Sequence, residues 1–246
     1  MRPRGPKNPY VRFQKLDKPP VALHESTLWD YPSQHYGRRP QGDANYRGAT
    51  PSHVIWNVLQ RWTKPGDLVV DPFCGSGTTL DVCRDLGREG RGFDVGSPRD
   101  DVERADARDL PLEDESVDLV FFDPPYADNL AYSDDPRCIG KLAAETGEWQ
   151  EAMAAVLAES ARVLKPGGVC AVFLCDIFKV KLGKRRFLPL GLYLAAAAES
   201  AGLVPIEHIA VVRRGKTLET GSGSRQAAKD RFLLRGFSHL LVFAKP

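Results

Sequence analysis

The chain has 246 residues, of which 42% are hydrophobic and 27% charged, so it has the composition of an ordinary globular protein with one large core. No stretch approaches the roughly 18 apolar residues that span a bilayer, and the start MRPRGPKNPYVRF lacks the apolar segment of a secretory signal. We therefore expect an α/β protein of the cytoplasm that has no membrane partner.

The net charge of +2 conceals an uneven distribution. Residues 1–50 carry nine basic and four acidic side chains and residues 203–246 carry eight and three, whereas residues 51–202 carry 17 and 25. Two basic ends can form a nucleic-acid footprint, and solvated surface explains them equally well. The five cysteines form no C-x-x-C pair, and we expect neither disulfides nor metal ligands among them.

Strand and helix patterns alternate along most of the chain. The first 20 residues, rich in Pro, Lys and Arg, have no apolar period and predict a loose arm. We assign residues 1–44 to a basic N-terminal extension or lid and residues 45–246 to the main domain. In chain order the patterns predict a helix over 53–62, a strand over 67–71, a helix over 78–87, strands over 91–95, 102–105 and 116–123, a helix over 147–164, a strand over 169–175, a helix over 188–200, and strands over 203–212 and 238–244.

This alternation predicts a parallel sheet with helices on both faces. The last two strands follow each other without a helix, so one of them must run antiparallel to its neighbours. In such a sheet, ligands bind beyond the carboxyl ends of the strands, where the strand order reverses.

A glycine-containing loop, residues 71–79, follows the first strand of this sheet. Gly75 and Gly77 permit close backbone approach, which leaves N–H groups at the helix start facing an anionic or carboxylate-bearing ligand. Asp94 ends the next strand, 19 residues after Gly75, where its carboxylate can accept hydrogen bonds from both ribose hydroxyls. The combination predicts a nucleotide-type cofactor. Asp106, after the third strand, could accept from an adenine amino group, or it could cap a helix.

The sequence Asp123-Pro124-Pro125-Tyr126 directly follows the most hydrophobic strand. The two prolines fix φ and lack N–H donors, so the turn offers carbonyl oxygens and the Asp123 carboxylate as acceptors around one small volume. The aromatic ring of Tyr126 lies beside these acceptors. Acceptors and a ring are what an extruded adenine or cytosine requires.

Together, DPFCGSGTT and DPPY resemble the amino-methyltransferase family that makes N6-methyladenine and N4-methylcytosine, over roughly residues 45–245. The resemblance implies a Rossmann-like class I fold that uses S-adenosylmethionine, with seven strands, mostly parallel, and one antiparallel. It also implies that the start of the helix before the glycine loop, near Thr50 and Pro51, contacts the methionine end of the cofactor. The expected cofactor-binding residues are Thr50, Pro51, Asp71, Phe73, Gly75, Ser76, Gly77, Thr78, Thr79, Asp94, Asp106 and Ala107, and the expected catalytic residues are Asp123, Pro124, Pro125 and Tyr126.

An exocyclic amine is a poor nucleophile because its lone pair is delocalised into the ring. Hydrogen bonds from its N–H groups to Asp123 and to the Pro124 carbonyl can favour a pyramidal nitrogen whose lone pair faces the methyl group. Methylation of cytosine carbon 5 would instead need a nucleophilic cysteine, typically after a proline, and none of the cysteines follows one.

Candidate substrate contacts lie in the flanking segments. Trp29 and Tyr36 belong to an aromatic cluster that suggests a lid or base-stacking surface, or an extension packed on the sheet. Tyr132 lies in the loop after DPPY, which should face the substrate. Basic residues around the flexible GSGS segment could contact phosphates or merely increase solubility: Arg213, Arg214, Lys216, Arg225, Lys229 and Arg231.

Sequence-specific DNA members of the family carry a long target-recognition insert. Only 45 residues separate Gly77 from Asp123, and the residues after Tyr126 are needed to finish the sheet. The resemblance makes DNA the expected partner. The missing insert points instead to the alternative, ribosomal or another structured RNA. A protein-glutamine methylase and an inactive binding module are further alternatives, and Asp123 would serve adenine or cytosine equally.

Overall fold

The computed structural model describes residues 23–31, 33–37, 39–43, 46, 48–97, 99–127, 133–181, 184–212, 225, 227, 229 and 231–246. Most of its strands form one eight-stranded sheet in the order β1-β9-β10-β6-β5-β2-β3-β4. The strands of this sheet are β1 (Leu28–Trp29), β2 (Leu68–Asp71), β3 (Glu89–Asp94), β4 (Glu103–Arg104), β5 (Val117–Phe122), β6 (Leu164–Leu174), β9 (Val204–Val212) and β10 (Phe237–Ala244). A separate hairpin pairs β7 (Ile177–Lys181) with β8 (Lys184–Leu188).

The sheet is parallel except for β10, which runs antiparallel to both β6 and β9. The predicted seven strands with one antiparallel member are therefore confirmed, and β1 adds an eighth at the edge beside β9. Chain order reverses between β2 and β5, which are hydrogen-bonded neighbours. This reversal creates a crevice at the carboxyl ends of the two strands.

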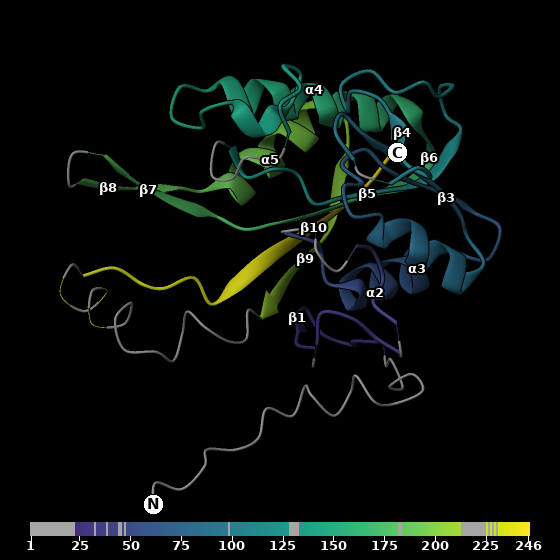
Figure 1. Ribbon diagram of the computed structural model, residues 1–246, viewed down its shortest axis with the longest axis horizontal. Helices are drawn as coiled ribbons and strands as arrows, with labels where there is room; N and C mark the ends of the chain where they lie inside the picture. The colour runs from purple at the N-terminus through teal and green to yellow at the C-terminus, as the bar shows by residue number, and fades with distance from the viewer. Residues whose placement is uncertain are drawn as a thin grey trace, which may run out of the picture.

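Helices cover both faces of the sheet, as Figure 1 shows. One face packs against α2 (Ser52–Trp62) and α3 (Thr78–Leu86), and the other against α4 (Glu148–Val163) and α5 (Leu190–Ser200). Successive strand residues enter opposite cores because side chains alternate along a strand: Val69 joins the α2–α3 core and Val70 the α4–α5 core. In the described part of the chain, no helix combines the length and apolarity needed to cross a membrane.

Three features differ from the sequence-based expectation. The hairpin β7–β8 was not expected. Helix α5 begins at Leu190 and not at Leu188, because Pro189 disfavours helical geometry in the residue before it. Strand β6 already begins at Leu164, and the expected turn at residues 165–168 is an irregularity within it, where Gly167 has φ +79° and the register with β5 shifts.

The described part of the N-terminal segment joins the sheet. Trp29 in β1 pairs with Val211 of β9, and its side chain is 1% exposed. Such burial of a large aromatic side chain contributes strongly to the core. The division of the chain at residue 44 stays a prediction.

Candidate active site

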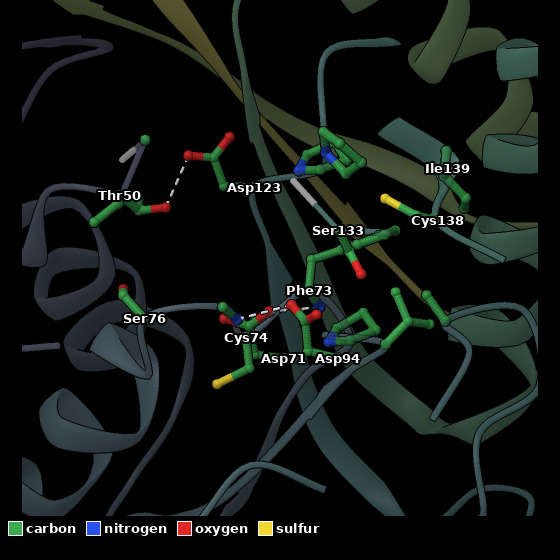
Figure 2. A pocket seen from close by; sticks show the side chains of 18 of the residues that line it. Thr50, Asp71, Phe73, Cys74, Ser76, Asp94, Asp123, Ser133, Cys138 and Ile139 are labelled. Carbon is green, nitrogen blue, oxygen red and sulfur yellow. Dashed lines mark hydrogen bonds between the residues drawn. The ribbon is translucent and has the colours of Figure 1, made fainter. Parts of the chain in front are cut away.

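A cavity of about 280 Å³ opens at the carboxyl ends of β2, β3 and β5. It lies at the reversal of strand order, where α/β sheets bind ligands. Fourteen of the sixteen residues expected to bind the cofactor or act in catalysis line the cavity, the exceptions being Pro51 and Gly77. Figure 2 shows how Thr50, Asp71, Asp94 and Asp123 converge there from separate elements.

The glycine loop is fastened at both ends by one buried carboxylate. Asp71 accepts hydrogen bonds from the Phe73 amide at 3.0 Å and from the Thr79 hydroxyl at 2.5 Å. Between them, Gly75 and Gly77 have φ of +40° and +74°, values that favour glycine. Gly77 is the N-cap of α3, so the loop passes directly into the amino end of a helix.

Burial raises the pKa of Asp71 to about 7, although the bonds from Thr79 and Phe73 oppose this effect. Because the folded-state pKa lies above the unfolded value, the native state binds more protons between about pH 4 and 7, and this group lowers stability as pH rises through that window. Asp71→Asn removes the titration. The free energy of unfolding of the variant, measured in urea, should therefore rise relative to that of the native protein between pH 5 and pH 8. The rise is up to about 1.4 kcal/mol for each unit by which the Asp71 pKa is raised. Parallel pH profiles for the two proteins would contradict this assignment.

Asp94 joins the glycine loop to the loop that follows β3. Its carboxylate accepts hydrogen bonds from the Gly75 amide at 3.0 Å and the Gly96 amide at 2.8 Å. Burial raises the pKa of Asp94, against the effect of these two bonds. Each carboxylate oxygen retains a second lone pair for a hydroxyl of a ligand.

Asp106 also lines the cavity, but no described helix begins there. It organises a tight turn, in which its carboxylate accepts bonds from the Arg108 amide at 3.0 Å and the Arg108 guanidinium at 2.7 and 2.9 Å. Burial alone would raise the pKa of Asp106, but the bonds from Arg108 outweigh it and the pKa lies below its usual value. The helix-cap alternative therefore does not apply, and an ionised acceptor faces the cavity.

The Asp123 carboxylate is held on both sides. The Thr50 hydroxyl donates to Oδ2 at 2.8 Å and the Tyr126 hydroxyl donates to Oδ1 at 2.6 Å. Thr50 was expected to contact the methionine end of the cofactor, and the structure shows it supporting the proposed catalytic carboxylate.

The rest of this turn is fixed by helix α4. The indole N–H of Trp149 donates to the Pro125 carbonyl at 2.8 Å, and Trp149 is fully buried. The Ala127 amide donates to the same carbonyl at 2.9 Å. The prolines restrict φ and these bonds fix the position, so the acceptors of the turn are preorganised.

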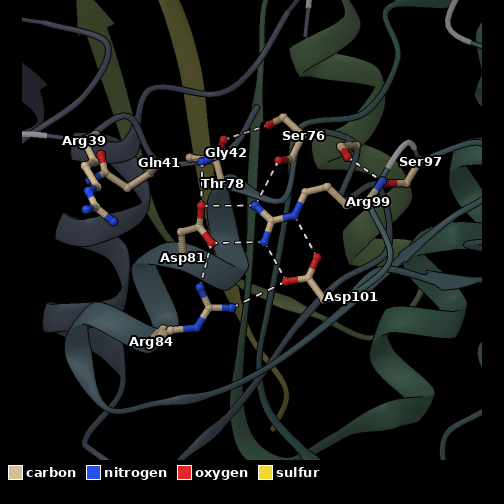
Figure 3. A network of polar contacts seen from close by, with 11 residues as sticks. Arg39, Gln41, Gly42, Ser76, Thr78, Asp81, Arg84, Ser97, Arg99 and Asp101 are labelled. Atoms are coloured by element: carbon tan, nitrogen blue, oxygen red, sulfur yellow. Dashed lines mark hydrogen bonds and ion pairs between the residues drawn. The ribbon is translucent and has the colours of Figure 1, made fainter. Parts of the chain in front are cut away.

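A charged network braces the outer side of the glycine loop (Figure 3). Arg99 donates to both oxygens of Asp81 at 3.1 Å, to Asp101 at 2.5 and 2.7 Å, and to the Ser76 carbonyl at 3.4 Å. A Cβ at Gly77 would lie 2.5 Å from the Arg99 guanidinium, so glycine is required there for space as well as for conformation. Gly77 thus lies against this network, outside the cavity lining.

Several predicted substrate contacts lie elsewhere. Trp29 and Tyr36 are 1% and 3% exposed and pack in the core, and the Tyr36 hydroxyl donates to Asp85 at 2.9 Å. The hypothesis of a base-stacking surface does not fit these two buried rings. Arg225 is exposed, as are Lys229 and Arg231, and none of the three lines the cavity. Tyr132, Arg213, Arg214 and Lys216 lie outside the described residues.

Two polar cavity residues were missed in the sequence. A Cβ at Gly75 would lie 2.7 Å from the Tyr46 hydroxyl, so the ring of Tyr46 covers the glycine loop. Arg235 reaches the cavity from just before β10. Both are distant in sequence from the two motifs, and no local pattern marks them. Cys138 and Ile139, at the start of the short helix η2 (Ile139–Lys141), also line the cavity and belong to the loop after DPPY that was expected to face the substrate.

Cys74 lines the cavity, and burial raises the pKa of its thiol well above the usual value. All five cysteines lie within the described residues, where each is buried and unbridged. Because the thiolate is the reactive form, Cys74 is poorly suited to act as a nucleophile.

Comparison with known proteins matches residues 6–98 to the family model described as DNA methylase, of the N6/N4 type. This range includes the glycine loop and ends before Asp123. The family resemblance seen in the sequence is confirmed over this part of the chain.

Two curated relatives are Type II methyltransferases. M.HpaI of Haemophilus parainfluenzae is 31% identical over 77 residues, which cover 30% of this chain and 23% of the relative. M.MjaII of Methanocaldococcus jannaschii is 38% identical over 50 residues, which cover 20% of this chain and 9% of the relative. The matches therefore span less than a quarter of the length of either relative.

Among solved structures, a geranyl diphosphate methyltransferase in complex with geranyl diphosphate and sinefungin aligns with a TM-score of 0.51 and 17% identity. The alignment covers 80% of this chain and 78% of that one. At this identity the likeness shows the fold alone, and it confirms the expected α/β architecture with a mostly parallel sheet.

Proposed function

We propose that this chain transfers a methyl group from S-adenosylmethionine to the exocyclic amino group of a base in DNA. The observation that carries the proposal is the Asp123 carboxylate, held by Thr50 and Tyr126 and lining the same cavity as Asp94 and the glycine loop. One cavity thus combines a cofactor-type loop with preorganised acceptors for an amine. The DNA methylase match over residues 6–98 supports the same function.

The cavity suits this cofactor in charge and in the chemistry of its lining residues. Its lining includes four carboxyl groups, of Asp71, Asp94, Asp106 and Asp123, and two guanidinium groups, of Arg137 and Arg235. A sulfonium cofactor with an amino and a carboxylate group has a net positive charge, which an acidic cavity favours. The cofactor supplies an electrophilic methyl group. Asp94 would accept from the ribose hydroxyls, and the apolar Phe73, Ala107 and Ile139, which also line the cavity, would contact the adenine ring.

The residues of the turn would activate the amine by geometry. Asp123 accepts one N–H of the amino group, and the Pro124 carbonyl accepts the other. Both acceptors draw the hydrogens to one side, so the lone pair turns toward the methyl donor. The Tyr126 ring lines the same cavity and is available for stacking on the base.

Asp94→Ala tests the cofactor site. The variant is expected to bind S-adenosylmethionine more weakly by about 1 to 3 kcal/mol, the cost of an unpaired polar contact, as measured by calorimetry. Asp100→Ala is the matched control, because Asp100 is a nearby exposed carboxylate that does not line the cavity. Equal affinities for the two variants would mean that another group holds the ribose.

Structured RNA is the second candidate substrate. The observation in its favour is that only 45 residues separate Gly77 from Asp123, and about half of them form α3, β3, β4 and β5, which leaves no room there for a recognition domain. RNA recognition through shape does not require such a domain.

Transfer of labelled methyl to matched pools of genomic DNA and ribosomal RNA separates the two candidates. We expect label in DNA. Label in RNA alone would make the second candidate correct, and the absence of label from both pools would contradict the proposed reaction.

A further inference from the structure

Arg235 brings a guanidinium group into the cavity from just before β10. Strand β10 runs antiparallel to β6, and His239 near its start pairs with Leu174 at the end of β6. The start of β10 therefore lies at the carboxyl edge of the sheet, where the cavity opens. Neither the proposed cofactor contacts nor the proposed catalytic turn includes this group.

The order of the strands places Arg235 on the opposite side of Asp123 from the proposed cofactor site. Strands β10, β6, β5, β2, β3 and β4 are consecutive neighbours in the sheet. Asp123 follows β5, whereas the glycine loop, Asp94 and Asp106 follow β2, β3 and β4. Arg235 therefore lies on the side of the cavity that remains for the substrate base.

One nitrogen of the Arg235 guanidinium is fixed to the backbone. Nη1 donates to the Asp176 carbonyl, and the guanidinium carbon lies 6.0 Å from the centre of the Phe178 ring. The Asp176 carboxylate accepts instead from the Gly191 amide and from Nε2 of His239, both at 3.0 Å. Arg235 forms no ion pair with any residue that the structure describes, so its charge is not neutralised by a carboxylate there.

The other edge of this guanidinium, formed by Nε and Nη2, has no hydrogen-bond partner among the described residues. The N–H groups of this edge are parallel and suit two neighbouring acceptors. Arg137, the other guanidinium of the cavity lining, shows this use, because its Nε and Nη2 donate to the two oxygens of Asp135 at 3.0 and 2.8 Å. Arg137 is therefore occupied, whereas half-buried Arg235 has a donor pair available to a ligand.

Cytosine and adenine differ in the acceptors beside their amino groups. In cytosine the ring nitrogen N3 and the carbonyl oxygen O2 follow the amino group along one edge, and both accept hydrogen bonds. In adenine the ring nitrogen N1 follows the amino group, and a C–H group comes next. A pair of guanidinium donors is satisfied by cytosine, whereas with adenine one donor would face a C–H group and lose its hydration without compensation.

We propose that Arg235 selects cytosine as the base that is methylated, an inference that rests on the proposed function. Asp123 and the Pro124 carbonyl accept the amino hydrogens, while Nε and Nη2 of Arg235 donate to N3 and O2 of the same base. The base is thus held at both ends of one edge, and the product is N4-methylcytosine. Arg235 positions the base and determines specificity, and it exchanges no proton.

The first test identifies the base that the native protein methylates. Genomic DNA is incubated with the protein and labelled S-adenosylmethionine and is then digested to nucleosides for mass spectrometry. We expect N4-methylcytosine without N6-methyladenine. N6-Methyladenine as the main product would overturn the inference and retain the proposed amino-group methylation, whereas the absence of any labelled base would reject the proposed function itself.

Arg235→Lys keeps the charge but replaces the paired donors with a single ammonium group. On a DNA oligonucleotide that the native protein methylates at one cytosine, we expect kcat/KM to fall by about 10- to 100-fold, the usual effect of losing one bidentate base contact. Affinity for S-adenosylmethionine should stay native. Arg61→Lys is the matched control, because Arg61 is exposed in the last turn of α2 and does not line the cavity.

A substrate analogue separates base contact from a structural role. 3-Deazacytosine at the methylated position removes the N3 acceptor and keeps the amino group. The ratio of kcat/KM for cytosine to that for 3-deazacytosine should be about 10-fold higher in the native protein and in Arg61→Lys than in Arg235→Lys, because only Arg235 loses a partner. Equal ratios in all three proteins would overturn the inference. Weakened cofactor binding by Arg235→Lys would also overturn it, since the group would then serve the cofactor.

Discussion

Replacing Asp123 with alanine is expected to slow methyl transfer by about 10²- to 10³-fold, the usual loss when one preorganised polar group of an active site is removed. Cofactor affinity should remain within a few fold, because the Asp94 and glycine-loop contacts are independent of Asp123. The measurement is single-turnover transfer of labelled methyl, with calorimetry for the cofactor.

Asp123→Asn separates the charge of this group from its shape. The amide keeps one acceptor oxygen but replaces the other with a donor, so it cannot both accept from Thr50 and Tyr126 and face an amino group. We expect it to lose nearly as much activity as the alanine variant. Near-native turnover in either variant would remove Asp123 from the mechanism.

Trp149→Ala is expected to lower the free energy of unfolding by about 3 to 5 kcal/mol, as for other large aromatic side chains removed from a core. Trp149 is fully buried in the α4–α5 core and also donates to the Pro125 carbonyl. The same variant should slow methyl transfer, since the proposed catalytic turn loses one of the two bonds that hold the Pro125 carbonyl. Urea unfolding and the transfer assay measure the two effects.

Trp149→Phe is the matched control for volume. It retains most of the ring but not the N–H donor, so the Pro125 carbonyl keeps only the bond from the Ala127 amide, and the loss of one hydrogen bond costs about 0.5 to 1.5 kcal/mol. If this variant has native stability and native turnover, the bond to Pro125 does not hold the turn.

The features predicted best from the sequence are those fixed by neighbouring residues. The loop over residues 71–79 and the turn over residues 123–126 each follow a strongly apolar strand, so their position at the carboxyl edge follows from chain order alone. The same reasoning identifies Asp94, at the end of its own strand. The structure places all three around one cavity.

The features that were missed depend on long-range contacts. Thr50 meets Asp123 across 73 positions of sequence, and no local pattern marks that contact. The sequence around Trp29 left open whether its ring forms a stacking surface or packs on the sheet, and pairing of β1 with β9 buries it.

The hairpin β7–β8 was missed although a signal was present. Phe178-Lys179-Val180-Lys181 alternates apolar and basic residues with the period of a strand, and Gly183 follows as a turn residue. This short pattern lies between two longer and more apolar elements, β6 and α5.

Identification of the methylated atom is the most direct test of the proposed chemistry. DNA incubated with the protein and labelled S-adenosylmethionine is digested to nucleosides and analysed by mass spectrometry. We expect label in N4-methylcytosine or N6-methyladenine. Label in 5-methylcytosine, or no labelled nucleoside while the protein binds the cofactor, would contradict amino-group methylation at the Asp123 turn.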